Sequence, residues 1–325
     1  MAGGRRGLRP RSLLHLWSVY CRPKVEYASE LWEGVISESW AAKLESLQTM
    51  VMRVALGAPD NASAVGMRAE SGLQTLASRR WAARLTFFRK LATAPRGNLA
   101  SIIFRCRCSQ VDAGVATRSW CHRTKALLSQ LGLESWWSAM ERDPPTKGGW
   151  KAIVQAAVTA RAASAEESLV ANSSSLAWYR KLGRSWMDDM PRYLDDRSSL
   201  QGVRLKTRLR LECLPLMRQT ARQLGWPDDG AICPLCDTAV EDTQHFLQGC
   251  PAFSRERQVL HAILKDRLGT AGGPGTEALA QFAGGGEQQL LLMLGAQPRF
   301  KLPEQHEQED EEELARGFSL AEHLI

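Results

Sequence analysis

The chain of 325 residues has no uninterrupted apolar run of about 18 residues, the length that a membrane-spanning helix needs, so we expect no membrane partner. It also lacks a glycine-rich phosphate loop, a nucleophile elbow and an HExxH motif, and it therefore offers no motif for catalysis by the enzymes that carry them. A hydrophobic fraction of 44% is nevertheless enough to bury a core, which excludes wholesale disorder.

The charge balance is basic, with 42 Lys and Arg residues against 35 Asp and Glu residues and a net charge of +7. This average hides an asymmetry, because the segment from Lys301 to Ile325 contains eight acidic and two basic residues. The remaining 300 residues therefore carry +13. A strongly basic body indicates an acidic partner, and we expect RNA or DNA.

Hydrophobic periodicity predicts a mainly α-helical protein, with helices at 38–56, 73–92, 119–131, 149–170, 176–187, 216–224 and 287–294. Residues 203–211 alternate between apolar and basic side chains, which fits a strand with four cations on one face, but their helix propensity favours a helix from about 199. The five cations within 73–92 fit either a solvated helix face or a phosphate-facing surface. We divide the chain at composition changes into helical segments 1–95 and 96–198, a basic helix with a metal module at 199–268, and a Gly-rich linker with a flexible acidic tail at 269–325.

The strongest local motif is Cys233-x2-Cys236-x8-His245-x4-Cys250. Two cysteines three positions apart can present both sulfurs from one turn, and the other two residues can close the opposite side. Three thiolates and one imidazole fill a tetrahedral shell, which suits a structural Zn²⁺ with no position left for a catalytic water. Thiolate ligands also predict a reducing compartment, nuclear or cytoplasmic.

Two weaker motifs are also present. Cys106, Cys108 and Cys121 with His122 could form a second metal site, although a Cys-x-Cys spacing suits a tetrahedral ion poorly, and Cys21 and Cys213 fit packing positions. The tetrapeptide 193–196 spells Y-x-D-D, the metal-binding signature of reverse transcriptases, but its polar flanks predict an exposed loop instead of the hairpin that this chemistry needs.

Three stretches resemble the region that follows the polymerase domain in reverse transcriptases of non-long-terminal-repeat retrotransposons. The first stretch combines residues 13–20 and 25–32. The second stretch matches the family's pattern at Leu44, Leu47, Gln48, Arg53, Leu56 and Gly57, and then at 67–70, Gly72, Leu76, Arg79 and Arg80. The third is the Cys/His cluster with 241–247, Pro251 and a basic residue at 255 or 257, which resembles the zinc-knuckle-like module near the C-terminus of those proteins. The family's polymerase palm lies upstream of everything found in this sequence.

The resemblance implies a thumb-like helical bundle, a connector and a zinc knuckle that grip nucleic acid for an RNA-directed DNA polymerase, while this chain alone is not expected to polymerise. On that basis we expect phosphate contacts from Arg204, Lys206, Arg208, Arg210, Arg255 and Arg257. Trp226 could stack on a base, although burial near the metal site is the favoured alternative. Two other functions stay open, namely a polymerase fragment that uses Asp195 and Asp196, and a zinc-stabilised protein-interaction scaffold.

Overall fold

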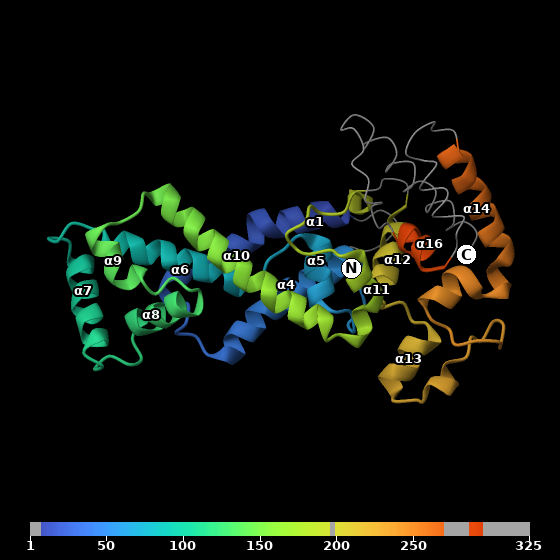
Figure 1. Cartoon of the computed structure of the whole chain (residues 1–325), viewed down its shortest axis with the longest axis horizontal. Helices are drawn as coiled ribbons and strands as arrows, with labels where there is room; N and C mark the ends of the chain where they lie inside the picture. Colours follow the sequence, from blue (N-terminus) through green and yellow to red (C-terminus); the bar gives the residue numbers. More distant parts are fainter. Residues whose placement is uncertain (1–7, 196–198, 270–285, 295–325) are drawn as a thin grey trace. The chain divides into compact units, whose positions relative to one another are not determined.

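The computed structural model describes residues 8–195, 199–269 and 286–294 (Figure 1). Within these ranges the protein is mainly helical and has no strand, which confirms the predicted helical class. One isolated antiparallel bridge joins Ile232 to Val240. Most of the predicted linker and the acidic tail lie outside the described residues. None of the described helices combines the length and the apolar character that crossing a membrane would demand.

The chain forms two compact units, and each unit draws on segments that are distant in the sequence. Unit 1 comprises residues 1–15, 51–72 and 170–325, and unit 2 comprises residues 16–50 and 73–169. The units thus interleave along the chain, whereas the sequence analysis divided it linearly at 95, 198 and 268.

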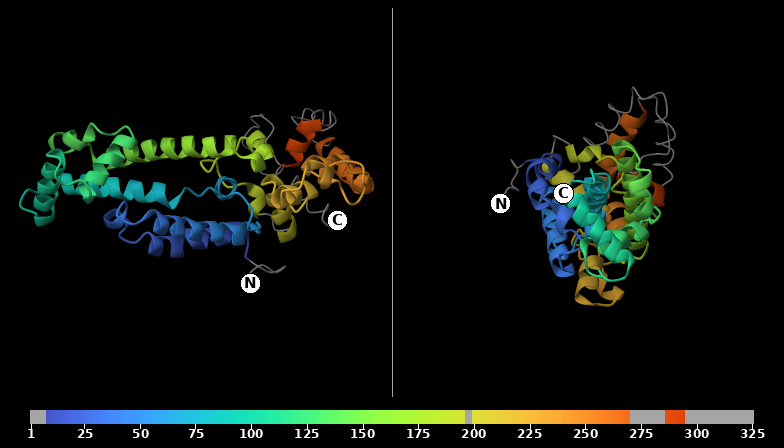
Figure 2. Two further views of the ribbon diagram at one scale, coloured as in Figure 1. Left: turned by 90° about the horizontal axis from the view of Figure 1, so that it is seen from below. Right: turned by 90° about the vertical axis from the view of Figure 1, so that its left-hand side faces the viewer.

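Unit 2 is a helical assembly around an aromatic core. Its main helices are α3 (Ser29–Trp32), the first part of α4 (Glu38–Leu56), α6 (Leu76–Ala92), α7 (Leu99–Asp112), α8 (Trp120–Gln130), α9 (Trp136–Arg142) and most of α10 (Lys147–Ala171). Figure 2 shows α6 and α10 running alongside each other, and the Trp150 indole N–H of α10 donates to the Leu85 carbonyl of α6 at 2.8 Å. Phe88 lies at the centre of this core, edge-on to Phe104 and stacked on Trp137. Large aromatic side chains such as Phe88, Phe104 and Trp150 are buried in the core that these short helices share.

The start of α6 is fixed by groups from its own cap and from α4. The Thr75 hydroxyl accepts from the backbone N–H of Ser78 at 3.2 Å, which is a standard N-cap. The Glu45 carboxylate accepts from the N–H groups of Leu76 at 3.3 Å and Ala77 at 2.8 Å. A negative charge at this position also favours the helix dipole, so the α4 sequence helps to determine where α6 begins.

Four of the five cations predicted on α6 bind other parts of unit 2. Arg79 pairs with Glu26, and buried Arg80 pairs with Glu33, while Arg89 donates to the Pro145 carbonyl. Buried Arg84 donates to Thr124 at 2.9 Å and to the Trp120 carbonyl at 2.7 Å, and burial lowers its pKa to about 10. Neither expectation, a solvated face or a phosphate-facing surface, holds for these four residues, because each of them binds a partner on α8 or in a turn or loop of the same unit.

Unit 1 contains α5 (Ala64–Ser71), the short 3-10 helices η2 (Ser174–Leu176) and η3 (Arg192–Asp195), α11 (Ala177–Leu182), α12 (Leu200–Arg210), α13 (Met217–Leu224), η4 (Asp228–Ala231), α14 (Ser254–Gly269) and α16 (Gly286–Met293), together with most of α1 (Pro10–Leu16). Residues 200–210 are helical, as predicted, and Gly183 in the left-handed region ends α11 earlier than expected.

A buried ion pair lies at the centre of unit 1. The Arg210 guanidinium of α12 donates to the Glu70 carboxylate of α5 at 2.8 Å, and the two residues are 1% and 0% exposed. The Tyr193 hydroxyl donates to the same carboxylate at 2.6 Å, and the Arg210 Nη1 donates to the carbonyl of Leu294. Burial raises the pKa of both Tyr193 and Tyr179 well above the usual range, so both phenols keep their protons beside the ion pair.

Candidate metal centre

The four predicted ligands are presented by a short hairpin-like loop and by the helical turn after it. Backbone hydrogen bonds from Cys233 to Ala239, at 2.9 Å, and from Glu241 to Ala231, at 2.8 Å, close the loop. Within it the Asp237 N–H donates to the Cys233 carbonyl at 2.9 Å, which folds the Cys-x-x-Cys segment into a tight turn. His245 begins a single π-helical turn, η5 (His245–Gly249), and Cys250 follows directly.

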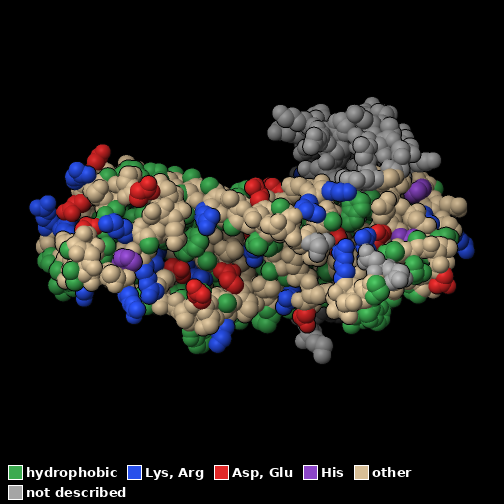
Figure 3. All heavy atoms as spheres, turned by 60° about the horizontal axis from the view of Figure 1, so that its bottom comes forward, with side chains coloured by type: hydrophobic (Ala, Val, Ile, Leu, Met, Phe, Trp, Pro, Cys, Tyr) green, Lys and Arg blue, Asp and Glu red, His purple; other side chains and the backbone are tan. Residues whose placement is uncertain are grey.

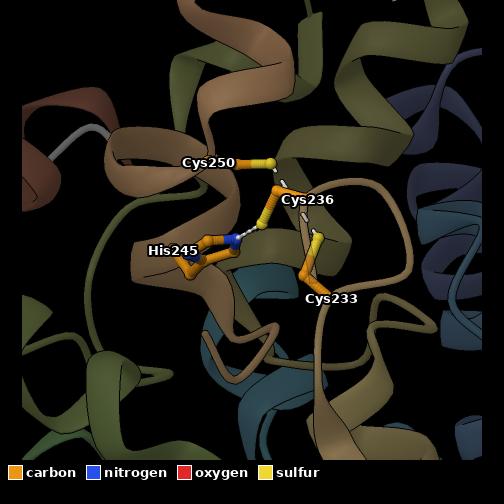
Figure 4. Close-up of side chains that lie close together, drawn as sticks. All are labelled: Cys233, Cys236, His245 and Cys250. Carbon is orange, nitrogen blue, oxygen red and sulfur yellow. Dashed lines mark hydrogen bonds between the residues drawn. The ribbon is translucent and has the colours of Figure 1, made fainter. Parts of the chain in front are cut away.

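The side chains of these four residues converge on one point (Figure 4). All four candidate ligand atoms lie within 4.8 Å of one another, which is close enough to hold a metal ion. The sulfurs of Cys233 and Cys250 are 3.8 Å apart, and the Cys236 sulfur is 3.3 Å from the His245 Nε2. On a tetrahedral ion with bonds of about 2.3 Å to sulfur and about 2.0 Å to nitrogen, these separations should be about 3.8 Å and about 3.5 Å. The cluster is therefore compatible with zinc.

The environment of the thiols differs across the cluster. Cys233 and Cys250 are buried at 1% exposure each, whereas Cys236 is partly exposed. Burial raises the pKa of Cys233, while hydrogen bonds from the Thr238 hydroxyl and backbone lower the pKa of Cys236 to about 6.

Two acidic residues that the sequence analysis did not select hold the ligand-bearing segments in place. The Asp242 carboxylate accepts from the His245 backbone N–H at 2.8 Å and also pairs with Arg218 of α13 at 2.8 Å. Buried Glu241 accepts from the Met217 N–H at 2.8 Å and so ties the loop to the start of α13. The position of Asp242 three residues before His245, as a helix N-cap candidate, is the signal that could have identified it.

The helical form of α12 separates the four cations that were expected to act together. Positions two residues apart face opposite sides of a helix, so Arg204 and Arg208 share one side and Lys206 and Arg210 share the other. The Arg208 Nε donates to the Gly57 carbonyl at 2.8 Å, and the Arg204 side chain lies against the same glycine. Gly57 has a φ of +63°, and a Cβ at this position would clash with Arg204.

On the other side of α12, Lys206 lies over the Tyr193 ring at 5.1 Å. Arg210 is buried against Glu70, which corrects its expected role as a phosphate contact, because an arginine enclosed by its own carboxylate partner presents no charge to solvent.

The remaining predicted residues near the metal cluster have different surroundings. The Arg257 Nη2 donates to the Cys250 carbonyl and so braces the last ligand, whereas Arg255 is exposed at the start of α14. Trp226 is 48% exposed, so the favoured expectation of a buried tryptophan was wrong. The indole follows Gly225, whose left-handed conformation ends α13 and turns the chain outward.

The structure brings neither the other cysteines nor the described part of the Y-x-D-D segment into a group that could hold a metal ion. Among the described residues, Cys106, Cys108, Cys121 and His122 do not form a group that could hold an ion. Cys213 is buried, as predicted, but Cys21 is exposed. The Y-x-D-D segment lies on η3 instead of a hairpin, with Tyr193 buried and Asp195 paired with Arg11, while Asp196 is outside the described residues.

Comparison of the chain with protein-family models, with curated proteins and with solved structures finds no match. The geometry therefore defines the class of site on its own: a compact Cys₃His cluster in a helical protein, able to hold one metal ion.

Proposed function

We propose that the chain is a zinc-stabilised nucleic-acid-binding protein, and that it corresponds to the non-catalytic region which follows the polymerase in retrotransposon reverse transcriptases. The observation that carries the proposal is the closed Cys₃His cluster, whose ligand spacing matches tetrahedral zinc. Three thiolates and one imidazole leave no coordination position for a substrate or water, so the ion supports the fold. Residues Cys233, Cys236, His245 and Cys250 hold it, and their reduced thiols fit a nuclear or cytoplasmic location.

The proposal of nucleic-acid binding is supported by the basic body and by the resemblance of its sequence motifs. Phosphate binding supplies a salt-sensitive and largely sequence-independent affinity. Arg255 is exposed beside the metal cluster, and Arg208 uses its Nε for Gly57, which leaves its two Nη groups to donate elsewhere. Figure 3 shows that Lys and Arg side chains are scattered over the visible face and do not form a single stripe. We therefore expect moderate affinity from dispersed contacts.

Two measurements test the two parts of this proposal. Metal analysis of the purified full chain should find one Zn²⁺ per molecule, and a metal-free but folded protein would overturn the zinc assignment. Filter binding of labelled RNA and single-stranded DNA over a range of salt should give an affinity that falls steeply as salt rises. Undetectable binding at about 50 mM salt, where phosphate contacts are strong, would favour the scaffold function instead.

The polymerase alternative has little support from the site. Two adjacent carboxylates could bind Mg²⁺ only if both faced an open cleft, but Asp195 pairs with Arg11 on a 3-10 turn. Primer extension on an RNA template with Mg²⁺ decides the question. We expect no extension, and extension that is abolished by Asp195→Ala would establish catalysis.

A further inference from the structure

The metal module differs in charge from the rest of the chain. Residues 213–250 contain five acidic residues against two arginines and have no lysine. A Zn²⁺ held by three thiolates and a neutral imidazole would add one more negative charge. Arg218 is already paired with Asp242. By composition, residues 213–250 are thus an acidic part of a basic protein.

The same module exposes four large apolar side chains, which we call the module tip: Leu224, Trp226, Ile232 and Leu235. Their exposed fractions are 57%, 48%, 38% and 56%. Leu224 ends α13, and α13 packs on η4, after which Ile232 and Leu235 lie on the metal-binding loop. The four side chains come from one stretch of 12 residues, and several exposed large apolar side chains on one small module indicate an interaction site, whereas single ones are ordinary.

The tip is held in place by backbone hydrogen bonds and by the metal ligands. The Trp226 N–H donates to the Ala221 carbonyl at 2.8 Å, and the Gly230 N–H donates to the Pro227 carbonyl at 3.0 Å. The Trp226 indole N–H makes no hydrogen bond with any described residue, so it is left for a partner. Leu235 lies between Cys233 and Cys236, so metal binding also fixes its position. A fixed tip loses little conformational entropy on binding, as is usual for interface anchor residues.

Acidic residues are neighbours of these apolar residues along the chain. Asp228 and Asp229 follow Trp226 and Pro227 in the sequence, and exposed Asp237 follows the second cysteine of the turn. Exposed Asp237 and the acidic composition of residues 213–250 disfavour a polyanion as the partner. The same composition is complementary to a segment that carries an apolar anchor between lysines or arginines.

We propose that the module tip is a docking surface for a protein partner, namely a basic segment with an aromatic or aliphatic anchor residue. This site is separate from the nucleic-acid function proposed for the basic body. It depends only on a folded, metal-loaded module, so the two proposals fail independently. The anchor would pack on Trp226 and Leu235, and its basic neighbours would meet the negative charge of the module, to which exposed Asp237 contributes.

The test uses the full zinc-loaded chain and a phage-displayed library of random dodecapeptides. We expect the selected peptides to combine an aromatic or large aliphatic residue with lysine or arginine. As labelled synthetic peptides, they should bind at least about tenfold more weakly to Trp226→Ser and to Leu235→Ser. Asp237→Asn should weaken binding several-fold, mainly by slowing association, and asparagine tolerates the left-handed backbone of that position. Leu169→Ser is the matched control, because Leu169 is 54% exposed on α10, outside the module, and its loss should leave affinity within about twofold.

Each other outcome overturns the proposal. The proposal of a docking surface would be refuted by no enrichment, by enrichment of acidic peptides, or by equal binding of the Trp226 and control variants. Measurement of single-stranded RNA binding by the same variants provides a further check, because a loss of RNA affinity in Trp226→Ser would identify the tip as a base-stacking surface instead. Zinc content and circular dichroism establish that each variant is folded, so unfolding of the module cannot be mistaken for loss of peptide binding.

Discussion

Replacing Arg210 should destabilise unit 1 strongly without weakening nucleic-acid binding. Arg210→Met keeps the approximate length of the side chain but leaves the Glu70 carboxylate, which is 0% exposed, with a hydrogen bond from Tyr193 and no countercharge. Breaking a buried ion pair in this way costs about 3–5 kcal/mol. Burial alone would lower the pKa of Arg210, but the combined interactions with Glu70, Tyr193 and Tyr179 outweigh it and raise that pKa.

Urea unfolding of the purified full chain, followed by circular dichroism, measures the loss in free energy of unfolding. The matched control is Glu70→Gln/Arg210→Met, which removes both charges while the introduced amide oxygen can still accept from the Tyr193 hydroxyl. It should recover most of the lost stability, since neutral replacements of buried pairs are often tolerated. Filter binding should give the same dependence of nucleic-acid affinity on salt for the parent, the single variant and the double variant. Stability of Arg210→Met within about 1 kcal/mol of the parent, or a double variant no better than the single, would refute the argument.

Three further outcomes follow from the structure. Cys236→Ser should lose the bound zinc, measured by metal analysis, and with it the protease resistance of residues 213–250. The control Cys106→Ser, at an exposed cysteine, should keep one zinc per chain. Retention of the ion by Cys236→Ser would contradict the ligand set. Burial raises the pKa of Cys213 to about 12. Its alkylation by iodoacetamide, followed by mass spectrometry, should therefore be negligible at pH 8 and should rise about tenfold per pH unit below that pKa. Exposed Cys21 should react at once, and rapid labelling of Cys213 would refute its burial. Arg255→Gln should lower the slope of log affinity against log salt by about 0.7 to 0.9, and an unchanged slope would exclude Arg255 as a phosphate contact.

Features that depend on nearby residues could be predicted from the sequence. Helix α4 has the predicted bounds, because its apolar period is regular and Gly57 and Pro59 end it. The metal cluster was predictable for the same reason, since its four ligands lie within 18 residues and their spacing carries the geometry. Helix α7 was missed because arginines and cysteines interrupt its apolar pattern, although Asn98 caps it.

Features that depend on distant residues could not be predicted. Arg210 and Glu70 are 140 positions apart, and neither position alone indicates burial. Likewise, the cations of α6 take their partners from Glu26, Glu33 and the loop before α10. A charge pattern within one helix is the same for a solvated face and for a set of internal ion pairs, so the side-chain partner decides which one forms.

The interleaved arrangement of the two units has a consequence for the order in which the chain folds. All of unit 2 has been synthesised once residue 169 has left the ribosome, so its aromatic core can form early. Unit 1 must wait, because Glu70 is made long before Arg210, and the Leu294 carbonyl that also binds Arg210 comes 84 residues later still. During this interval the carboxylate of Glu70 stays in solvent, and α5 has no partner in α12. A fragment that starts after residue 72 would carry the metal ligands but leave Arg210 without its countercharge. The ion pair that joins α5 to α12 therefore forms only after most of the chain has been made.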